Sequence, residues 1–376
     1  MKAELQIIPV SNKRQFRRFI MLPWKLYRDD PNWVPPLILD QKKLLDRKKN
    51  PFYAHSAAEF FLAVRNGEVV GRIAALVNDN HNKFHEEQTG FLGFFESIED
   101  YEVTHALLET AEQWLRERNM KIMRGPMNPS TNDTCGFLLE GFNSPPIVMM
   151  TYNPPYYLEF MEKYGMQKAK DLYAFYMETN TPISEKIKHI TELVRRRHNI
   201  TVRTINMKNF HQEVKVIKQI YNRAWSRNWG FVPMTDEEFN HLAKDLKPVV
   251  EPELLLIAEV NGEPAGFSLA IPDFNQALKR INGRLLPFGI LKLLWYSRKI
   301  DMVRVITMGV IHKYQKLGID AVFYYETYTR GSAKGFWRGE FSWILKDNYS
   351  MVNTLEKMGA TVYKKYRIYE KSISKV

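Results

Sequence analysis

The chain has 376 residues, a length that fits two domains or one large domain. Hydrophobic residues make up 45% and charged residues 26%, which is typical of a folded globular protein and excludes collagen-like and disordered classes. Lysine and arginine (54) outnumber aspartate and glutamate (42), and the resulting net charge of +12 favours anionic partners without choosing among phosphates, nucleic acid and an acidic membrane surface.

Signals for export, membrane insertion and thiol chemistry are missing. The first ten residues include Lys2 and Glu4 and no long apolar core, so we expect no signal peptide. No run of about 18 uncharged apolar residues occurs, which argues against a spanning helix. The single cysteine, Cys135, cannot form an internal disulfide or supply a zinc finger. These features predict a basic cytoplasmic protein.

The first predicted elements are a strand over residues 5–10 and a hairpin over residues 62–77, in which Asn66-Gly67 separates two apolar runs. Asn-Gly between apolar runs is a strong hairpin signal. The same pattern returns in residues 257–272, where Asn261 follows Asn66 by 195 positions. The two hairpins are the first indication of an internal repeat.

A second pair of similar segments follows each hairpin. Residues 160–178 and residues 354–371 each read as a short helix ending in Glu-Lys-x-Gly, followed by an alternating strand rich in tyrosine. Gly165 and Gly359 stand where glycine is expected just past a helix end, 194 positions apart. Two matches at nearly one offset predict a duplicated α/β domain.

Helices between these anchors complete the predicted order. An amphipathic helix over residues 103–118, with Asp100 as its N-cap, corresponds to a helix over residues 319–334. The first half holds an insertion near residues 128–150, and the second half holds one near residues 279–300.

We therefore predict the α/β class, with an α+β mixed sheet and helices on both faces, in two tandem domains. The domains are expected to span residues 1–180 and 181–376, with a break near residues 180–184.

The second half contains a distinctive strand-to-helix turn. Residues 306–318 read ITMGVIHKYQKLG, and the turn itself is Gln315-Lys316-Leu317-Gly318-Ile319-Asp320. It resembles the turn of the GNAT superfamily of acyl-CoA N-acyltransferases, which reads Gln or Arg, two residues, Gly, one residue, then Gly or Ala. Asp320 departs from that pattern. Asn348 matches the asparagine at the start of the superfamily's last helix.

The chain also resembles, over nearly its full length, a group of bacterial tandem-GNAT proteins described as acyltransferases. The stretches that carry this resemblance are Leu22-Pro23-Trp24, Asn32-Trp33-Val34-Pro35-Pro36, Asn50-Pro51-Phe52, Arg124-Gly125-Pro126, Asn228-Trp229-Gly230-Phe231 and Tyr366-Arg367-Ile368-Tyr369. Some similar proteins are linked to N-acylation of long-chain sphingoid bases. The resemblance thus implies two GNAT-like domains.

The resemblance also implies a binding site for acetyl-CoA or a longer acyl-CoA in the second domain. Backbone N–H groups at a helix start bind anions, so the turn is expected to hold the diphosphate. The N–H of Val310 or Ile311 is expected to polarise the acyl carbonyl, and Gly309 to accompany a bulge where the strand leaves its neighbour. The expected donor-binding residues are Gly309, Val310, Ile311, Gln315, Lys316, Leu317, Gly318, Ile319 and Asn348.

The sequence does not identify the groups that move protons. The superfamily often has a tyrosine seven residues after its asparagine, where this chain has Leu355, and residues 304–311 contain no acid. The catalytic candidates in the neighbourhood are Tyr324, Glu326, His312 and Asp236, together with Tyr325 and Glu340. For each of these residues, a purely structural role is the open alternative to a catalytic one. The first domain has the acidic Ser97-Ile98-Glu99-Asp100 in place of the turn, which predicts a scaffold without a donor site.

Two segments are expected to contact the acceptor or a membrane. Asn228, Trp229 and Phe231 lie where the superfamily covers its acceptor, or else form an aromatic corner of the core. The insertion 279–300 mixes Leu, Phe and Trp with six basic residues and fits either an interfacial segment on an anionic membrane or a buried connecting helix.

His81 and His85 have the spacing of metal ligands on a helix, but no third ligand is evident, and no metal is expected. Walker and Gly-x-Ser-x-Gly motifs do not occur.

The leading hypothesis is an acyl-CoA-dependent N-acyltransferase acting on an amine, including a long-chain sphingoid-type amine. It would be cytoplasmic or peripheral at the inner membrane. Two alternatives stay open: a Fem-like transferase that uses aminoacyl-tRNA, which the charge of +12 suits although nucleic acid is not the expected partner, and a non-catalytic protein that binds lipid or a membrane surface.

Overall fold

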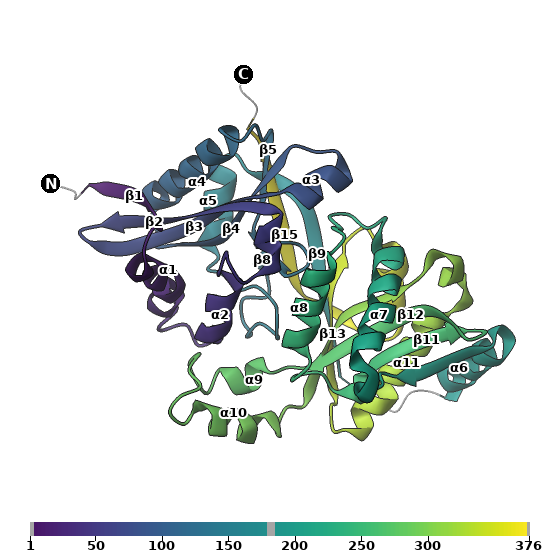
Figure 1. The fold of residues 1–376 in the computed structure, drawn as a ribbon. Helices are drawn as coiled ribbons and strands as arrows, with labels where there is room; N and C mark the ends of the chain where they lie inside the picture. Colours follow the sequence, from purple (N-terminus) through teal and green to yellow (C-terminus); the bar gives the residue numbers. More distant parts are fainter. Residues whose placement is uncertain (1–3, 179–184, 374–376) are drawn as a thin grey trace. The chain divides into compact units, whose positions relative to one another are not determined.

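A computed structural model describes residues 4–178 and 185–373 and divides them into two compact units (Figure 1). Unit 1 contains residues 4–172, 278–293 and 364–373, and unit 2 contains residues 173–178, 185–277 and 294–363. Each unit is a mixed α/β structure, as predicted. The expected break at residues 180–184 lies outside the described residues.

Unit 1 has a sheet in the order β1-β2-β3-β4-β5, followed by β15. Its pairs are antiparallel except β4 with β5, which is parallel. Its elements are β1 (Leu5–Pro9), α1 (Lys13–Leu26), α2 (Ile38–Leu44), η1 (Pro51–Ala54), β2 (Ser56–Arg65), β3 (Glu68–Asn78), α3 (Asp79–His85), β4 (Thr89–Ser97), α4 (Tyr101–Arg116), β5 (Ile122–Gly125), β6 (Met127–Asn128), β7 (Thr134–Cys135), β8 (Phe137–Glu140), α5 (Tyr156–Lys163), the first half of β9 (Gln167–Glu178), the start of α10 (Gly289–Ser297) and most of β15 (Thr361–Ser372).

Unit 2 has the corresponding sheet in the order β10-β11-β12-β13-β14, with β9 beside β14. Again the pairs are antiparallel except β13 with β14, which is parallel. Its elements are the second half of β9, α6 (Glu185–His198), β10 (Ile200–Thr204), η2 (Met207–Asn209), α7 (Phe210–Trp225), α8 (Asp236–Leu246), η3 (Pro252–Leu254), β11 (Leu255–Val260), β12 (Glu263–Pro272), α9 (Asn275–Leu278), the end of α10, β13 (Met302–Val310), η4 (His312–Leu317), α11 (Ile319–Ala333), β14 (Arg338–Leu345) and α12 (Tyr349–Lys357).

The predicted repeat is present in the local geometry of both units. Asn66 and Asn261 have φ of 54° and 52°, and the glycine after each also has positive φ, which is the conformation of a two-residue turn matching strand twist. Gly165 and Gly359 have φ of 91° and 90° just past α5 and α12. Both positions therefore require the left-handed conformation that glycine adopts without strain.

The last strand of each repeat packs in the unit formed by the other repeat. Tyr369 of β15 pairs with Gly125 of β5 and lies in the core of unit 1. Phe175 of β9 lies in the core of unit 2, where it packs with Tyr324 and Leu355. The sequence repeats and the compact units therefore differ at their last strands, a feature that the sequence pattern did not predict.

The insertion at residues 279–300 is attached at its start to unit 1. Lys279 Nζ donates to Pro31 O at 2.5 Å, and Trp24 Nε1 donates to Asn282 O at 3.3 Å. A Cβ on Gly283 would lie 2.4 Å from Pro36 O, so this close approach requires glycine. In the described part of the chain, no helix has the length and apolar character needed to cross a membrane.

Candidate functional site

The central strands of unit 2 separate at one end. β13 and β14 pair in parallel only between Met302 and Val305 on β13 and their partners on β14. From residue 306 to Val310, β13 continues beside β12 alone within the described residues. The register between β12 and β13 shifts at Leu269 and Ala270, which leaves Ile306 as the extra residue of a bulge. One edge of β13 is thereby released from strand pairing at its end.

The amides along this released edge alternate in direction. The Ile311 N–H donates to Ala265 O at 2.8 Å, so it is already used within the sheet. Because N–H groups of an antiparallel strand point alternately toward and away from the partner strand, the Val310 N–H is directed away from β12. Of the two amides expected to polarise an acyl carbonyl, Val310 thus stays a candidate and Ile311 does not.

Gly309 has a different role from the one expected for it. The bulge lies at Ile306, three residues earlier. A Cβ on Gly309 would lie 2.0 Å from the Trp225 ring of α7, so the glycine makes room for this tryptophan. Trp225 also packs on Phe267 of β12, with ring centroids 5.5 Å apart. The close approach of Trp225 therefore gives this glycine a packing role.

The turn after β13 leads directly into the start of α11. Gly318 has φ of 77° and occupies the N-cap position, and no side chain caps the helix. Gln315 and Lys316 are exposed, while Ile319 is buried and fixes the first turn against the core. The first N–H groups of a helix have no partner within it and carry the positive end of its dipole. This corner of unit 2 therefore meets the requirements of an anion site.

A buried polar cluster lies at the point where β13 and β14 separate. Arg304 and Glu340 are register partners with exposed fractions of 1% and 0%, and Arg304 Nε lies 3.7 Å from Glu340 Oε1. Arg304 Nε also donates to Ser342 Oγ at 3.0 Å, and the Ser342 hydroxyl donates to Glu340. The hydroxyl of Tyr363, a half-buried residue of β15, donates to Glu340 Oε2. We call Arg304, Glu340, Ser342 and Tyr363 the Glu340 cluster.

The strand registers show which face of the sheet carries this cluster. Phe267 and Ile271 share one face of β12, and Trp225 of α7 contacts that face at Phe267. Ile271 is the register partner of Arg304, which places Arg304 and Glu340 on the same face. Val305 lies one residue beyond Arg304, on the opposite face with α11. Glu340 was among the candidates predicted from the sequence, whereas Arg304 and Tyr363 were not, although a charged residue inside the apolar strand MVRVITMGV indicates a buried partner.

The other acid–base candidates occupy separate places in unit 2. Glu326 lies on α11 between Arg195 and Arg330, with contacts of 2.7 Å to each. Asp236 is an exposed first residue of α8, and its ion pair with Lys218 lowers its pKa.

Tyr324 is buried, and this burial raises its pKa. Tyr325 is half-buried on the same helix, and the Nε2 of His312 is buried without a partner. Among the candidates named from the sequence, only Glu340 joins the cluster at the strand separation.

Asn348 and the aromatic stretch before α8 have local structural roles. The Asn348 side chain caps α12 by accepting from the Met351 N–H at 3.3 Å. Phe231 is buried and packs on Tyr221 of α7, with centroids 5.6 Å apart. Asn228 is exposed and Trp229 is half-buried. Phe231 therefore belongs to an aromatic corner of the core, the second of the two roles considered for this stretch.

In unit 1 the corresponding turn and strand edge are occupied by the chain itself. The Asp100 side chain caps α4 by accepting from the Glu102 N–H at 2.9 Å, so the helix start already holds a carboxylate. The Phe94 N–H donates to Asn128 Oδ1 at 2.6 Å. A Cβ on Gly93 would lie 1.9 Å from Met127 O, which shows how closely β6 passes β4. The start of α4 and the edge of β4 are therefore occupied, whereas no side chain caps α11 in unit 2.

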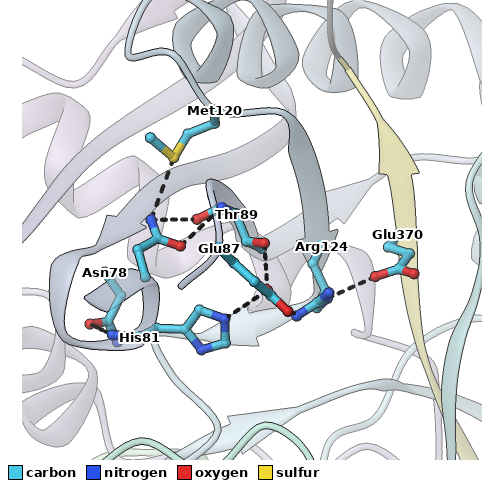
Figure 2. A network of polar contacts seen from close by, with 8 residues as sticks. Asn78, His81, Glu87, Thr89, Met120, Arg124 and Glu370 are labelled. Carbon is cyan, nitrogen blue, oxygen red and sulfur yellow. Dashed lines mark hydrogen bonds and ion pairs between the residues drawn. The ribbon is translucent and has the colours of Figure 1, made fainter. Parts of the chain in front are cut away.

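His81 belongs to a polar network in unit 1 (Figure 2). Its Nε2 lies 3.3 Å from Glu87 Oε2, which also accepts from Thr89 Oγ1 at 2.8 Å and Arg124 Nη1 at 3.2 Å. Arg124 Nε donates to Glu370 of β15 at 2.8 Å. Within residues 4–178 and 185–373, no group of three or more His, Cys, Asp or Glu residues has the arrangement of a metal site.

The His81 network predicts a loss of stability in acid. Burial, followed by the neighbouring His85, lowers the pKa of His81 from 6.5 to about 4. Because the pKa of His81 in the folded state lies below that in the unfolded state, the unfolded state takes up the proton first as the pH falls. The free energy of unfolding is therefore unaffected by His81 above pH 6.5 and decreases as the pH falls from 6.5 toward 4. We expect a loss of about 3 kcal/mol over that window. Urea unfolding at a series of pH values measures it.

His81→Gln is expected to flatten the pH dependence of stability between pH 6.5 and 4, because glutamine does not titrate. His211→Gln, at an exposed histidine, is the matched control and should keep the wild-type slope. An unchanged slope in His81→Gln would contradict the assignment of this window to His81.

Comparison with solved structures defines the class of fold. A tandem GNAT protein from the clavulanic acid biosynthesis pathway has a similar fold, with a TM-score of 0.59 and 11% identity over 99% of this chain and 100% of its own. A probable N-acyltransferase from Enterococcus faecalis has a TM-score of 0.53 and 9% identity over 98% of this chain and 73% of its own. The fold is that of a GNAT-type N-acyltransferase in tandem form, as the sequence resemblance predicted.

Two curated proteins with higher sequence identity than these solved structures show the family to which the chain belongs. A Caulobacter vibrioides protein named bacterial ceramide synthase is 37% identical over 384 residues, covering 99% of this chain and 98% of the relative. The Escherichia coli protein YghO is 36% identical over 372 residues, covering 96% and 94%. The chain belongs to the family of these two proteins and is an N-acyltransferase. No protein-family profile matches it.

Proposed function

We propose that this protein transfers an acyl group from acyl-CoA to the nitrogen of a long-chain amine, with the donor bound in unit 2. The observation that carries the proposal is the uncapped start of α11 next to the released edge of β13. Unit 1 has the same elements, but there Asp100 caps the helix and Asn128 binds the strand edge. One donor per chain is therefore expected.

The residues of unit 2 fit the chemistry of the donor. A diphosphate requires N–H donors and positive charge, which the first turn of α11 and Lys316 supply. Lys313 contributes less, because it is paired with Glu263 at 3.2 Å. The Val310 N–H is the candidate donor to the acyl carbonyl oxygen.

The Glu340 cluster offers a route for the proton that acyl transfer releases. The reaction forms an N–C bond, breaks the C–S bond so that CoA leaves as its thiolate, and removes one proton from the attacking amine. In our proposal the phenol oxygen of Tyr363 accepts this proton while its own proton moves to Glu340. Arg304 and Ser342 hold the Glu340 carboxylate in position.

The nature of the acceptor is inferred from the relatives. A ceramide is a long-chain amino alcohol acylated on nitrogen, and the Caulobacter relative is named for its synthesis. A long-chain amine is therefore the first acceptor to test, with short soluble amines as the comparison. An acyl-CoA assay with these amines separates this function from the two alternatives, an aminoacyl-tRNA-dependent transferase and a non-catalytic lipid-binding protein, because neither alternative consumes acyl-CoA.

The donor site is tested by thermal shift with CoA. We expect millimolar CoA to raise the Tm of the wild type, because a ligand bound to the folded state stabilises it. Lys316→Glu should weaken CoA binding roughly tenfold, since it places a negative charge beside the diphosphate. Lys48→Glu, on an exposed turn of unit 1, is the matched control.

Failure of CoA to stabilise the protein would contradict the proposed donor. The acceptor is tested by following thiol release with acetyl-CoA and palmitoyl-CoA in the presence of sphinganine or a short-chain amine. Turnover with sphinganine in preference to short amines is the expected result, and no turnover with any pair would remove the proposed reaction.

A further inference from the structure

The insertion carries large apolar side chains that face solvent. No residue of α10 is buried, although the helix reads GILKLLWYS. Leu286, Phe288 and Leu291 have exposed fractions of 80%, 67% and 63%. We call the set Leu286, Phe288, Ile290, Leu291, Leu294 and Trp295 the apolar ridge. The alternative of a buried connecting helix is therefore wrong for this segment.

The ridge is held at both ends by buried residues. Ile281 and Ile300 are each 7% exposed, and the backbone at Gly283 bonds to the Ile38 N–H at 3.0 Å. Between these anchors, Gly283 is the one other buried residue, and all the remaining positions are exposed or half-buried. The segment is thus anchored near its ends and mostly exposed between them.

The charged residues of the insertion all have the same sign. The insertion at residues 279–300 contains six basic residues and no acidic one. These residues are Lys279, Arg280, Arg284, Lys292, Arg298 and Lys299. Lys292 lies between the apolar residues of α10, and Lys299 Nζ lies 3.7 Å from the centre of the Trp295 ring. Tryptophan and basic side chains next to each other are typical of the boundary between lipid headgroups and acyl chains.

We propose that the apolar ridge docks the protein on the surface of an anionic lipid bilayer. Leu, Phe and Trp side chains insert at the level of the headgroups, and Lys292 and Lys299 bind lipid phosphates. The charge argues against a second copy of the chain as the occupant, because two such ridges would bring twelve cations together without an anion. The inference goes beyond the proposed function and does not depend on acyl transfer.

Vesicle flotation tests the docking. We expect the full-length protein to float with vesicles of phosphatidylglycerol and phosphatidylcholine and to stay unbound with pure phosphatidylcholine. Phe288→Ser/Leu291→Ser should reduce binding at least tenfold, because it removes inserted apolar area. Leu39→Ser/Phe84→Ser removes two exposed apolar residues elsewhere on unit 1 and is the matched control.

The electrostatic part is tested separately with Lys292→Gln/Lys299→Gln. This variant should lose several-fold in binding to anionic vesicles and show a weaker dependence on salt, whereas Lys42→Gln/Lys48→Gln should behave as the wild type. Circular dichroism and Tm confirm that each variant is folded.

Three outcomes overturn the docking proposal: equal binding of Phe288→Ser/Leu291→Ser and wild type, no binding of the wild type to anionic vesicles, or concentration-dependent dimers that Phe288→Ser/Leu291→Ser abolishes. CoA stabilisation and turnover with a short soluble amine are measured on the same variants. They report on the acyl-transfer proposal alone, so the two proposals can fail independently.

Discussion

Glu340→Gln is expected to lower kcat for acyl transfer by roughly 10²–10⁴-fold, because glutamine cannot accept the proton that Tyr363 passes on. The change keeps the size of the side chain and an oxygen that can bond to Ser342. The affinity for CoA should stay near that of the wild type, since the start of α11 is unaltered. Steady-state kinetics with a saturating amine measures the effect.

Tyr363→Phe separates a catalytic effect from a structural one. Removal of this hydroxyl leaves Glu340 bonded to Ser342 and beside Arg304, so the fold should be retained while kcat falls. Glu263→Gln, at an exposed glutamate near the donor turn, is the control and should retain activity. Full activity in both Glu340→Gln and Tyr363→Phe would rule out the proton route.

Arg72→Met is expected to destabilise the protein by roughly 3–5 kcal/mol, because it leaves the Glu96 carboxylate, whose side chain is only 12% exposed, without its positive partner. In the wild type, Arg72 Nη2 lies 3.5 Å from Glu96 Oε1, and Arg72 Nη1 donates to Phe19 O at 2.6 Å. Tyr27 and Tyr157 donate to Glu96 Oε2, so they do not replace the lost charge. Urea unfolding at pH 7 measures the loss.

The pH dependence of Arg72→Met gives a second readout. Burial already raises the pKa of Glu96 in the wild type, and loss of the arginine raises it further. Because the pKa of Glu96 is higher in the folded state than in the unfolded state, its protonated form contributes to the free energy of unfolding at a pH below the unfolded-state pKa. This stabilisation is lost as the pH rises through the folded-state pKa. The deficit of the variant should therefore be smaller at pH 5 than at pH 8.

Two further variants complete this prediction. Arg72→Met/Glu96→Gln should recover part of the stability, because it removes the unpaired charge. Arg47→Met breaks an exposed ion pair with Glu59 and should cost less than about 1 kcal/mol. Equal effects of Arg72→Met and Arg47→Met would contradict the argument from burial.

The local elements of this fold were predictable because each depends on a few neighbouring residues. Asn66-Gly67 and Asn261-Gly262 define tight turns, and the structure has the left-handed φ values that those turns require. The turn at Gly318 followed from a short motif, and its conformation depends on that one glycine. Asp100 was predicted as an N-cap, and it caps α4.

The Glu340 cluster could be predicted only in part because its members meet through sheet register. Arg304 and Glu340 are 36 positions apart, and Tyr363 comes from a strand in yet another part of the chain. A single sequence contains the residue types but not the pairing that brings Arg304 beside Glu340. The same limit applies to Asn128, whose bond to Phe94 spans 34 positions.

The sequence alone determined the repeat, the two hairpins, the helices at residues 103–118 and 319–334, the GNAT-type turn at residues 315–320 and the resemblance that places the chain among N-acyltransferases. These features are carried by local spacing and by motifs that neighbouring residues define. Only the tertiary structure decided that the last strands exchange between units, that Glu340 lies with Tyr363 where β13 leaves β14, and that the apolar residues of α10 face outward. The physical reason is that burial and strand pairing depend on contacts between distant segments, such as Arg124 with Glu370 across 246 positions.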